Sequence, residues 1–301
     1  MKIGVLAGGN SAERDVSLSS GKAISDACKD LGYDVLSLDS QDDIKSLIPD
    51  LLSVDVVFNG LHGGDGENGV IPGFLQSLGV RFTGSGNESS AICMDKRVSK
   101  ALVHRKDILT PNWIALSSGD DVPMDHDLGY PVVVKPNSQG STIGLTIVQD
   151  QSELADAVAL ARQYDSVVLI EAFIAGREIT ISIIGDTAYP IVEIVPSHEL
   201  YDYECKYTQG MTDYFCPANL SEEITKSIQA SALKIHKLLG CRHYSRVDFR
   251  LDETNKAWFL EVNTLPGMTE TSLVPKSAAA AGLSFPELIQ TIINEALKDY
   301  W

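Results

Sequence analysis

Short apolar runs alternate with helical patterns in the first part of the chain. The runs predict strands at residues 2–7, 33–38, 54–58 and 80–83. Apolar residues between 23 and 31 share one face of a helix that Gly32 ends, and residues 71–78 predict a second helix. Strands that alternate with helices are typical of a parallel sheet, so we expect an α/β lobe here.

The middle of the chain has a different pattern. Helices are predicted at 95–103 and 152–163, and strands at 132–135, 144–148 and 167–171. A Gly/Ser-rich loop, NSQGSTIG (137–144), joins two of these strands. This mixture indicates a small α+β lobe.

The last part begins with a predicted strand at 179–184. A helix is expected at 221–239, capped by Ser221 and ended by Gly240. Two further strands, 244–251 and 257–263, are joined by the turn DETNK and predict an antiparallel hairpin. Residues 197–218 show little periodicity, and so long a loop in a compact domain is usually functional or disordered.

Length and charge narrow the function. A chain of 301 residues exceeds the usual size of one domain, so two or three domains are expected. Lys and Arg total 24 against 41 Asp and Glu, which gives a net charge of −17. An acidic chain is a poor general binder of nucleic acid or of an anionic membrane. Any anionic substrate must therefore be held by a few locally placed cations.

Targeting and redox features point to a cytoplasmic protein. The chain has no run of about 18 apolar residues, and its N-terminus lacks the apolar core of a signal peptide. The five cysteines are odd in number and widely scattered, without CxxC or HExxH spacing. We therefore expect reduced, mostly buried thiols and no zinc site.

The predicted hairpin carries the strongest chemical pattern. Because strand side chains alternate between faces, Arg246 and Asp248 point the same way, and so do Glu261 and Asn263. Pairing of the strands can gather these oxygen ligands beside Arg246. Hard oxygen ligands without thiols suit Mg²⁺ bound together with nucleotide phosphates. The alternative is a solvated polar face, which antiparallel sheets commonly have.

The loop 137–144 is a candidate anion site. Gly140 and Gly144 free the backbone so that successive N–H groups can face an anion, and Lys135 adds a positive charge at the strand end. The alternative is an ordinary hairpin loop. No GxxxxGK[ST] motif occurs, so an ATP site must be of another kind.

Two loops after predicted strands hold further candidates. The loop 7–21 lacks GxGxxG, which weighs against a dinucleotide-binding oxidoreductase. Its Glu13 either complements a helix dipole or pairs with a substrate ammonium. His62 follows a strand in a Gly-rich loop; it is either structural or part of a site at the strand ends. Tyr207, next to Lys206, is weak evidence alone.

Taken in order, these segments resemble the D-alanine–D-alanine ligases of the ATP-grasp superfamily. The resemblance is carried by GGNSAERDVSLSSG (8–21), LHGGDGENG (61–69), MDKRVSK (94–100), VKPNSQGSTIG (134–144), IEAFIAGREIT (170–180), KYTQGMTDYFCPA (206–218), RVDFRL (246–251) and LEVNTLPGMTETSLVP (260–275). It implies a three-domain ATP-grasp architecture: an N-terminal α/β substrate-binding lobe at 1–88, a central ATP-grasp lobe at 89–175, and a C-terminal ATP-grasp lobe at 176–301 with the metal site and a long lid loop. ATP would lie between the last two.

The resemblance also implies roles for single residues. Lys96 and Lys135 correspond to lysines that hold ATP phosphates. The adenine and ribose positions correspond to Glu171, Phe173, Ile174 and Glu178. The Mg²⁺ ligands correspond to Asp248, Glu261 and Asn263, and the groups that stabilise the tetrahedral intermediate to Arg246 and the Gly267 backbone.

The substrate positions follow in the same way. Glu13 corresponds to the carboxylate that receives the ammonium of the first D-alanine, with Ser141 and Tyr207 as hydrogen-bonding partners. The site of the second D-alanine corresponds to Lys206, Ser272 and Leu273. His62 falls on a motif position near the substrates.

The implied reaction joins two D-alanines through an acyl phosphate, with ATP as a substrate and two Mg²⁺ (or Mn²⁺) as cofactors, for peptidoglycan precursor synthesis. A homodimer is expected, with no nucleic-acid or membrane partner. The alternatives are another ATP-grasp carboxylate–amine ligase, including forms that accept D-lactate or D-serine second, and a non-catalytic binding module. Lys206 and Tyr207 favour D-alanine, and retention of Arg246 and the acidic cluster argues against the binding module.

Overall fold

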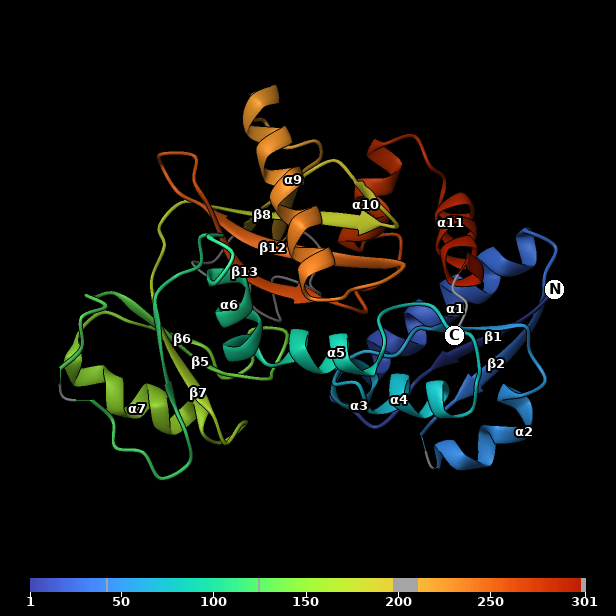
Figure 1. Ribbon diagram of the computed structural model, residues 1–301, viewed down its shortest axis with the longest axis horizontal. Helices are drawn as coiled ribbons and strands as arrows, with labels where there is room; N and C mark the ends of the chain where they lie inside the picture. The colour runs from blue at the N-terminus through green and yellow to red at the C-terminus, as the bar shows by residue number, and fades with distance from the viewer. Residues whose placement is uncertain (42, 124, 197–210, 299–301) are drawn as a thin grey trace.

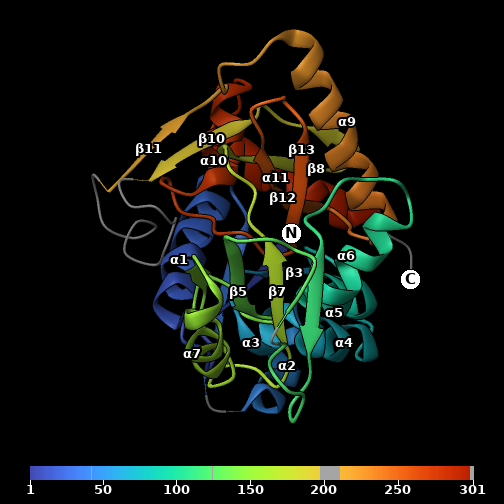
Figure 2. The same cartoon turned by 90° about the vertical axis from the view of Figure 1, so that its left-hand side faces the viewer.

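The secondary structure is built around three sheets (Figure 1). The computed structural model describes residues 1–41, 43–123, 125–196 and 211–298. Each sheet lies within one of the three residue ranges expected for the lobes. Figure 2 views the molecule from the side of the central lobe.

The first sheet is parallel, with strand order β2-β1-β3. Its strands are β1 (Lys2–Ala7), β2 (Asp34–Asp39) and β3 (Val56–Asn59). Its helices are α1 (Arg14–Asp30), η1 (Ile44–Leu47), α2 (Ile48–Leu51), α3 (Gly64–Glu67) and α4 (Val70–Ser77). The strand expected at 80–83 is wrong: only a single parallel bridge joins Phe82 to Val57. The chain leaves the sheet at once because Gly84 turns it, with φ of 97°.

Helix α1 lies very close to β1, which positions the loop that carries Glu13. A Cβ added at Gly21 would come within 2.4 Å of the Ala7 Cβ. Only a glycine permits this approach, since two Cβ atoms in a protein essentially never come that close to each other. The glycine at the end of GGNSAERDVSLSSG thus sets the spacing between helix and strand.

The second sheet is antiparallel, with order β4-β7-β5-β6. Its strands are β4 (Trp113–Leu116), β5 (Val132–Pro136), β6 (Thr146–Val148) and β7 (Val168–Ala172). Helix α7 (Gln151–Ala161) covers one face, where Leu154 and Val158 are fully buried against the strands. The predicted helix at 152–163 and the three predicted strands are confirmed. Strand β4 was not predicted.

The third sheet has the order β11-β10-β8-β12-β13, with β9 paired to β8. Its strands are β8 (Arg177–Ile184), β9 (Thr187–Ala188), β10 (Val192–Pro196), β11 (Thr212–Phe215), β12 (Tyr244–Leu251) and β13 (Ala257–Asn263). Helix α9 (Glu222–Leu238) covers it, and the Ser221 hydroxyl accepts a hydrogen bond from the Ile224 N–H as its cap. The expected loop 197–218 is wrong at residues 212–215, which form β11 along β10. Residues 197–210 of that loop lie outside the described part of the chain.

Several helices link the lobes. Helix α11 (Phe285–Lys298) packs on α1 and β3 of the first lobe as well as on α10 (Leu273–Ala280), the helix before it (Figure 1). Helices α5 (Asn87–Met94) and α6 (Lys96–His104) pack on β13 of the third sheet, and α10 packs on β8 and β10. In the described residues, no helix is both long and apolar enough to cross a membrane.

Candidate active site

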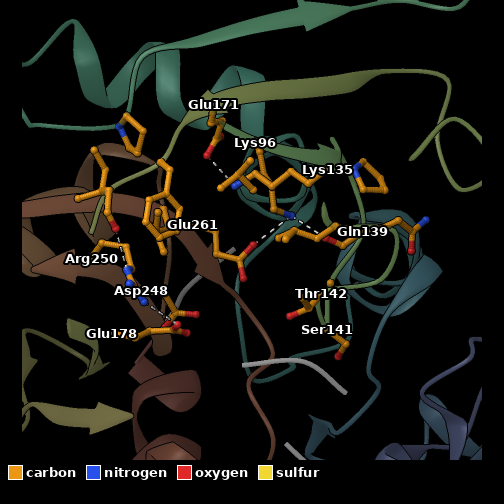
Figure 3. A pocket seen from close by; sticks show the side chains of 18 of the residues that line it. Lys96, Lys135, Gln139, Ser141, Thr142, Glu171, Glu178, Asp248, Arg250 and Glu261 are labelled. Carbon is orange, nitrogen blue, oxygen red and sulfur yellow. Dashed lines mark hydrogen bonds and ion pairs between the residues drawn. The ribbon is translucent and has the colours of Figure 1, made fainter. Parts of the chain in front are cut away.

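Two cavities meet where the three lobes come together. The first lies between the central and C-terminal sheets (Figure 3). Among its lining residues are the six expected at the nucleotide, Lys96, Lys135, Glu171, Phe173, Ile174 and Glu178. The second cavity lies against the N-terminal lobe and is lined by Glu13, His62, Asn263, Gly267, Ser272 and Leu273, among others. Both cavities share Gly140, Ser141, Arg246 and Glu261, so a group bound in one can reach a group bound in the other.

The hairpin face expected from strand alternation is present. Arg246 lies opposite Asn263 in the ladder, and Asp248 lies opposite Glu261. The Arg246 guanidinium donates from Nε and Nη2 to the two oxygens of Asp248, at 2.9 and 2.8 Å. Asn263 Nδ2 donates to the same carboxylate at 3.0 Å. The pairing register shifts only after Asp248. The side chains of Arg246, Asp248, Glu261 and Asn263 therefore lie in the part of the hairpin where the strands pair without a bulge.

The chemistry of this donor set fits a Mg²⁺ ion that shares phosphate ligands. Asp248 and Glu261 supply carboxylate oxygens, and each is in contact with a cation here: Arg246 at 2.8 Å and Lys96 at 3.0 Å. Within the described ranges, no group of three or more His, Cys, Asp or Glu side chains could hold a metal alone. A Mg²⁺ ion commonly takes one or two carboxylates and completes its shell with phosphate and water. Two carboxylates and an amide are therefore a sufficient protein contribution.

Lys96 connects the hairpin to the Gly/Ser-rich loop. It begins helix α6, whose cap is the Asp95 carboxylate accepting from the Val98 N–H at 3.0 Å. Its Nζ donates to the Gln139 carbonyl at 2.7 Å and lies 3.0 Å from Glu261 (Figure 3). One cation thus holds both the loop and the acidic strand at the edge of the nucleotide cavity.

The loop 137–144 has an unusual backbone at its centre. Ser141 and Thr142 have φ values of 52° and 63°, in the left-handed region that glycine normally occupies. Both residues line the nucleotide cavity. Left-handed residues turn successive N–H groups toward one side, which is the geometry that anion-binding loops use. Such backbone strain is often associated with functional sites.

Glu171 sits between two lysines at the inner end of the cavity. It is 2% exposed, and its two oxygens lie 3.1 Å from Lys100 Nζ and 2.9 Å from Lys135 Nζ. Burial acts to raise the pKa of this carboxyl, but the two lysine charges hold the pKa below its ordinary value. The carboxylate is therefore ionised, although it is buried.

The connection between the central and C-terminal sheets forms another wall of this cavity. Phe173 and Ile174 line the cavity just after β7, and Glu178 lines it at the start of β8. Arg250 of β12 holds this segment, because its Nε donates to the Ile174 carbonyl at 3.2 Å and its Nη1 donates to Glu178 at 3.4 Å.

Glu13 lines the second cavity next to the loop 137–144. Glu13 is the N-cap residue of α1, yet its side chain makes no capping bond. Its Oε1 instead accepts a 2.6 Å hydrogen bond from the Ser141 hydroxyl. The carboxylate faces the cavity rather than the helix backbone, as a receptor for an ammonium group would.

His62 connects the N-terminal lobe to the segment that carries Gly267. Its Nδ1 lies 2.9 Å from the Leu265 carbonyl, and its Nε2 lies 3.0 Å from the Ser20 hydroxyl. The same hydroxyl accepts from the Met268 N–H at 3.2 Å. The segment is therefore held on both sides of Gly267.

Helix α10 begins at the edge of the second cavity. Ser272 is its N-cap, but the Ser272 side chain makes no capping bond to the helix N–H groups. Leu273 is the first residue of the helix and lines the cavity. Backbone N–H groups at a helix start attract anions such as a carboxylate.

Two expected residues, Lys206 and Tyr207, lie outside the described part of the chain. Sequence reasoning missed Lys100, Arg250 and Ser20. Arg250 had a usable signal, since it shares the strand face of Arg246 and Asp248. Lys100 lies one helical turn after Lys96, but this spacing alone does not indicate its partner.

Two joined cavities, one of them between two antiparallel sheets and lined by lysines and carboxylates, define a carboxylate–amine ligase of the ATP-grasp class. Residues 102–294 match the family model described as "D-ala D-ala ligase C-terminus". The chain belongs to the D-alanine–D-alanine ligase family.

The similarity to individual relatives extends over the whole chain. A D-alanine–D-alanine ligase of Halalkalibacterium halodurans is 45% identical, covering 99% of this chain and 100% of the relative. The crystal structure of the Bacillus anthracis ligase has a TM-score of 0.90 at 38% identity, covering 99% and 98% of the two chains. A crystal structure of a Bacillus anthracis D-alanine–D-alanine ligase complexed with ATP has a TM-score of 0.86 at 35% identity, covering 99% of this chain and 97% of that chain.

Proposed function

We propose that this protein uses ATP to join two D-alanine molecules into D-alanyl-D-alanine, a peptidoglycan precursor, through an acyl phosphate. The observation that carries the proposal is the junction of the two cavities at Ser141, Arg246 and Glu261. Ligases of this name are similar to the chain over its full length, and one similar structure is complexed with ATP.

ATP would occupy the first cavity. Lys96 and Lys135 supply positive charge for the phosphates, next to the left-handed turn at Ser141. Phe173 and Ile174 provide an apolar wall for the adenine, with Glu171 as an acceptor at the inner end. Glu178 at the start of β8 would accept hydrogen bonds from the ribose hydroxyls.

The metal requirement follows from the charge of the reactants. Asp248, Glu261 and Asn263 would hold two Mg²⁺ together with the phosphates, and Mn²⁺ could replace them because it prefers similar oxygen ligands. These ions, when bound, offset the repulsion between the D-alanine carboxylate and the γ-phosphate. Lys96 and Arg246 would then be released in part from the carboxylates they contact here.

The first half of the reaction activates a carboxylate. Glu13, oriented by the Ser141 hydroxyl, would hold the ammonium of the first D-alanine so that its carboxylate points toward the junction. A carboxylate oxygen attacks the γ-phosphorus, an O–P bond forms, and ADP leaves. The protein contributes positioning and charge neutralisation, as in other phosphoryl transfers.

The second half forms the peptide bond. The start of α10, at Ser272 and Leu273, would hold the carboxylate of the second D-alanine. Its free amine attacks the acyl carbon, and inorganic phosphate leaves from the tetrahedral intermediate. Arg246 and the Gly267 N–H would stabilise the developing oxyanion. Preorganised hydrogen-bond donors of this kind usually make the largest single contribution to catalysis of acyl transfer.

Water must be kept from the acyl phosphate, so the site has to close during turnover. The loop 137–144 borders both cavities and is one candidate lid. The long segment 197–218 is a second candidate by sequence. Lys206 and Tyr207 lie in its part outside the described residues and stay predictions. His62 would contribute by holding the Gly267 segment in place.

We further propose the organisation expected from sequence. The division into lobes at 1–88, 89–175 and 176–301 is supported by the location of the three sheets, with α11 returning to the first lobe. The family resemblance supports a homodimer, and synthesis of a precursor from ATP supports a cytoplasmic location.

The test is phosphate release from ATP with D-alanine, L-alanine or D-alanine plus D-lactate, with the product identified by mass. We expect rapid release and D-alanyl-D-alanine with D-alanine alone, and none with L-alanine. A preferred D-alanyl-D-lactate product would assign a different acceptor. Absence of D-alanine-dependent phosphate release would contradict the proposal.

A further inference from the structure

Lys100 is a buried cation just outside the nucleotide cavity. It lies on α6, and its side chain is 0% exposed. Its Nζ lies 3.1 Å from Glu171 Oε1 and 5.2 Å from the centre of the Trp113 ring. Lys100 does not line the cavity, whereas Glu171 does. Lys100 is therefore in direct contact with the nucleotide site through the Glu171 carboxylate in front of it.

The carboxylate is shared with a second lysine. Glu171 Oε2 lies 2.9 Å from Nζ of Lys135, which does line the cavity. Two lysines and one carboxylate carry a net charge of +1 when all are ionised. With Lys100 present, Glu171 does not neutralise Lys135 completely. Without Lys100, one carboxylate would balance one lysine, and the inner end of the cavity would be neutral.

Stability does not explain this arrangement. Taking charges out of water is costly, and apolar side chains of similar size are often as good or better for stability than a buried ion pair. Burial lowers the pKa of Lys100 to about 8, against the opposing effect of Glu171, which shows that its charge is held at a cost. The effect of the Lys100 charge on Glu171 and Lys135 therefore explains its position better than stability does.

We propose that Lys100 is a positioning residue for the nucleotide, acting through Glu171. It holds the carboxylate ionised, as an acceptor that cannot donate, and so favours a base with an amino group at the inner end of the cavity. It also leaves the charge of Lys135 available for phosphate. This inference rests on the proposed function, because it assumes that ATP binds in the first cavity.

The experiment compares Lys100→Met with Val103→Ala, using binding of ATP and of inosine triphosphate in the absence of D-alanine. Inosine triphosphate carries a keto oxygen in place of the adenine amino group. Methionine keeps most of the lysine volume without the charge. Val103 is fully buried on the same helix and belongs to the apolar core against the third sheet, so its truncation weakens packing without removing a charge from Lys100, Glu171 or Lys135.

We expect Lys100→Met to weaken ATP binding at least about tenfold, because one buried partner of a charge network is lost. The preference for ATP over inosine triphosphate should fall as well, because Lys135 alone then opposes the effect of burial on the Glu171 pKa, and the protonated fraction of the carboxyl can donate to a keto group. Val103→Ala should lower the melting temperature but leave this preference at the wild-type ratio.

A second comparison tests whether Lys100 acts through Glu171. In a Glu171→Gln background, Lys100→Met should cause no further loss of ATP affinity. This double variant carries no unpaired buried carboxylate, so it keeps the test available if Lys100→Met alone does not fold.

The outcomes are distinguishable. Wild-type ATP affinity and base preference in folded Lys100→Met would overturn this inference while leaving the proposed function intact. A further tenfold loss in the Glu171→Gln background would also overturn it. Failure of the wild-type protein to bind ATP would instead contradict the proposed function.

Discussion

The Ser141 hydroxyl donates a 2.6 Å hydrogen bond to Glu13 Oε1, joining two residues that are 128 positions apart in sequence. Ser141 belongs to the loop of the central lobe, and Glu13 stands at the start of α1 in the N-terminal lobe. The left-handed backbone of Ser141, with φ of 52°, directs its side chain to this partner. The bond lies where the two cavities meet, so it links loop position to the orientation of the proposed ammonium receptor.

We expect Ser141→Ala to lower kcat/KM for D-alanine by about ten- to a hundredfold, because a hydrogen bond to a charged group is worth about 1.5–3 kcal/mol. Phosphate release over a D-alanine series measures the effect. Ser227→Ala, at an exposed position of α9, serves as the control and should be neutral. An unchanged D-alanine profile in folded Ser141→Ala would show that the bond does not orient Glu13 for catalysis.

Glu261→Gln should nearly abolish turnover while the fold remains intact. The change removes the negative charge that lies 3.0 Å from Lys96 and that would bind the metal. Steady-state ATP turnover and Mn²⁺ binding with nucleotide present are the measurements. Glu253→Gln, in the exposed turn of the same hairpin, is the matched control. Near-normal turnover by folded Glu261→Gln would rule out the metal assignment.

Arg246→Ala should slow peptide formation by about 3–4 kcal/mol in activation free energy, with a smaller change in ATP affinity. Arg246→Lys keeps the charge but cannot reproduce the two-pronged contact with Asp248, so it should recover only part of the rate. Single-turnover rates and ATP binding, measured separately, distinguish these effects. A loss confined to ATP binding would make Arg246 a ground-state binder.

The stability of the fold should depend on the protonation of His236. Burial lowers the pKa of this imidazole to about 4, and its Nδ1 lies 2.7 Å from the Ser245 hydroxyl. Between pH 6.5 and 4, the unfolded chain binds a proton that the folded chain does not, so stability falls as the pH falls through this window. The loss from pH 7 to pH 5 should be about 2 kcal/mol in the free energy of unfolding.

Urea unfolding at both pH values checks this expectation. His236→Gln should reduce the pH dependence by that amount, whereas His104→Gln, at an exposed position, should leave it unchanged. Equal pH dependence in wild type and His236→Gln would show that other groups are responsible.

Much of the fold was accessible from local patterns. The helix 221–239 and the hairpin 244–263 follow from capping and alternation, and both are confirmed. The strand predicted at 80–83 is wrong. Its apolar residues are buried, but only a single bridge joins them to a strand, and an apolar run by itself does not distinguish buried residues from paired ones. Strands β10 and β11 were not predicted, because their short sequences carry little periodicity and they are identified only by their pairing with each other and with β8.

The sequence by itself determined which side chains share a strand face, where helices begin and end, and the ordered motifs of an ATP-grasp ligase. Strand geometry alone places Arg246 and Asp248 on one face, and this required no knowledge of the rest of the chain. The tertiary structure decided which distant groups meet, such as Ser141 with Glu13 and Lys100 with Glu171. Local periodicity sets the direction of a side chain relative to its own backbone. The distance to a partner some 70 or more residues away depends on how the lobes pack. A buried charge is stable only when that packing places a group of opposite charge beside it.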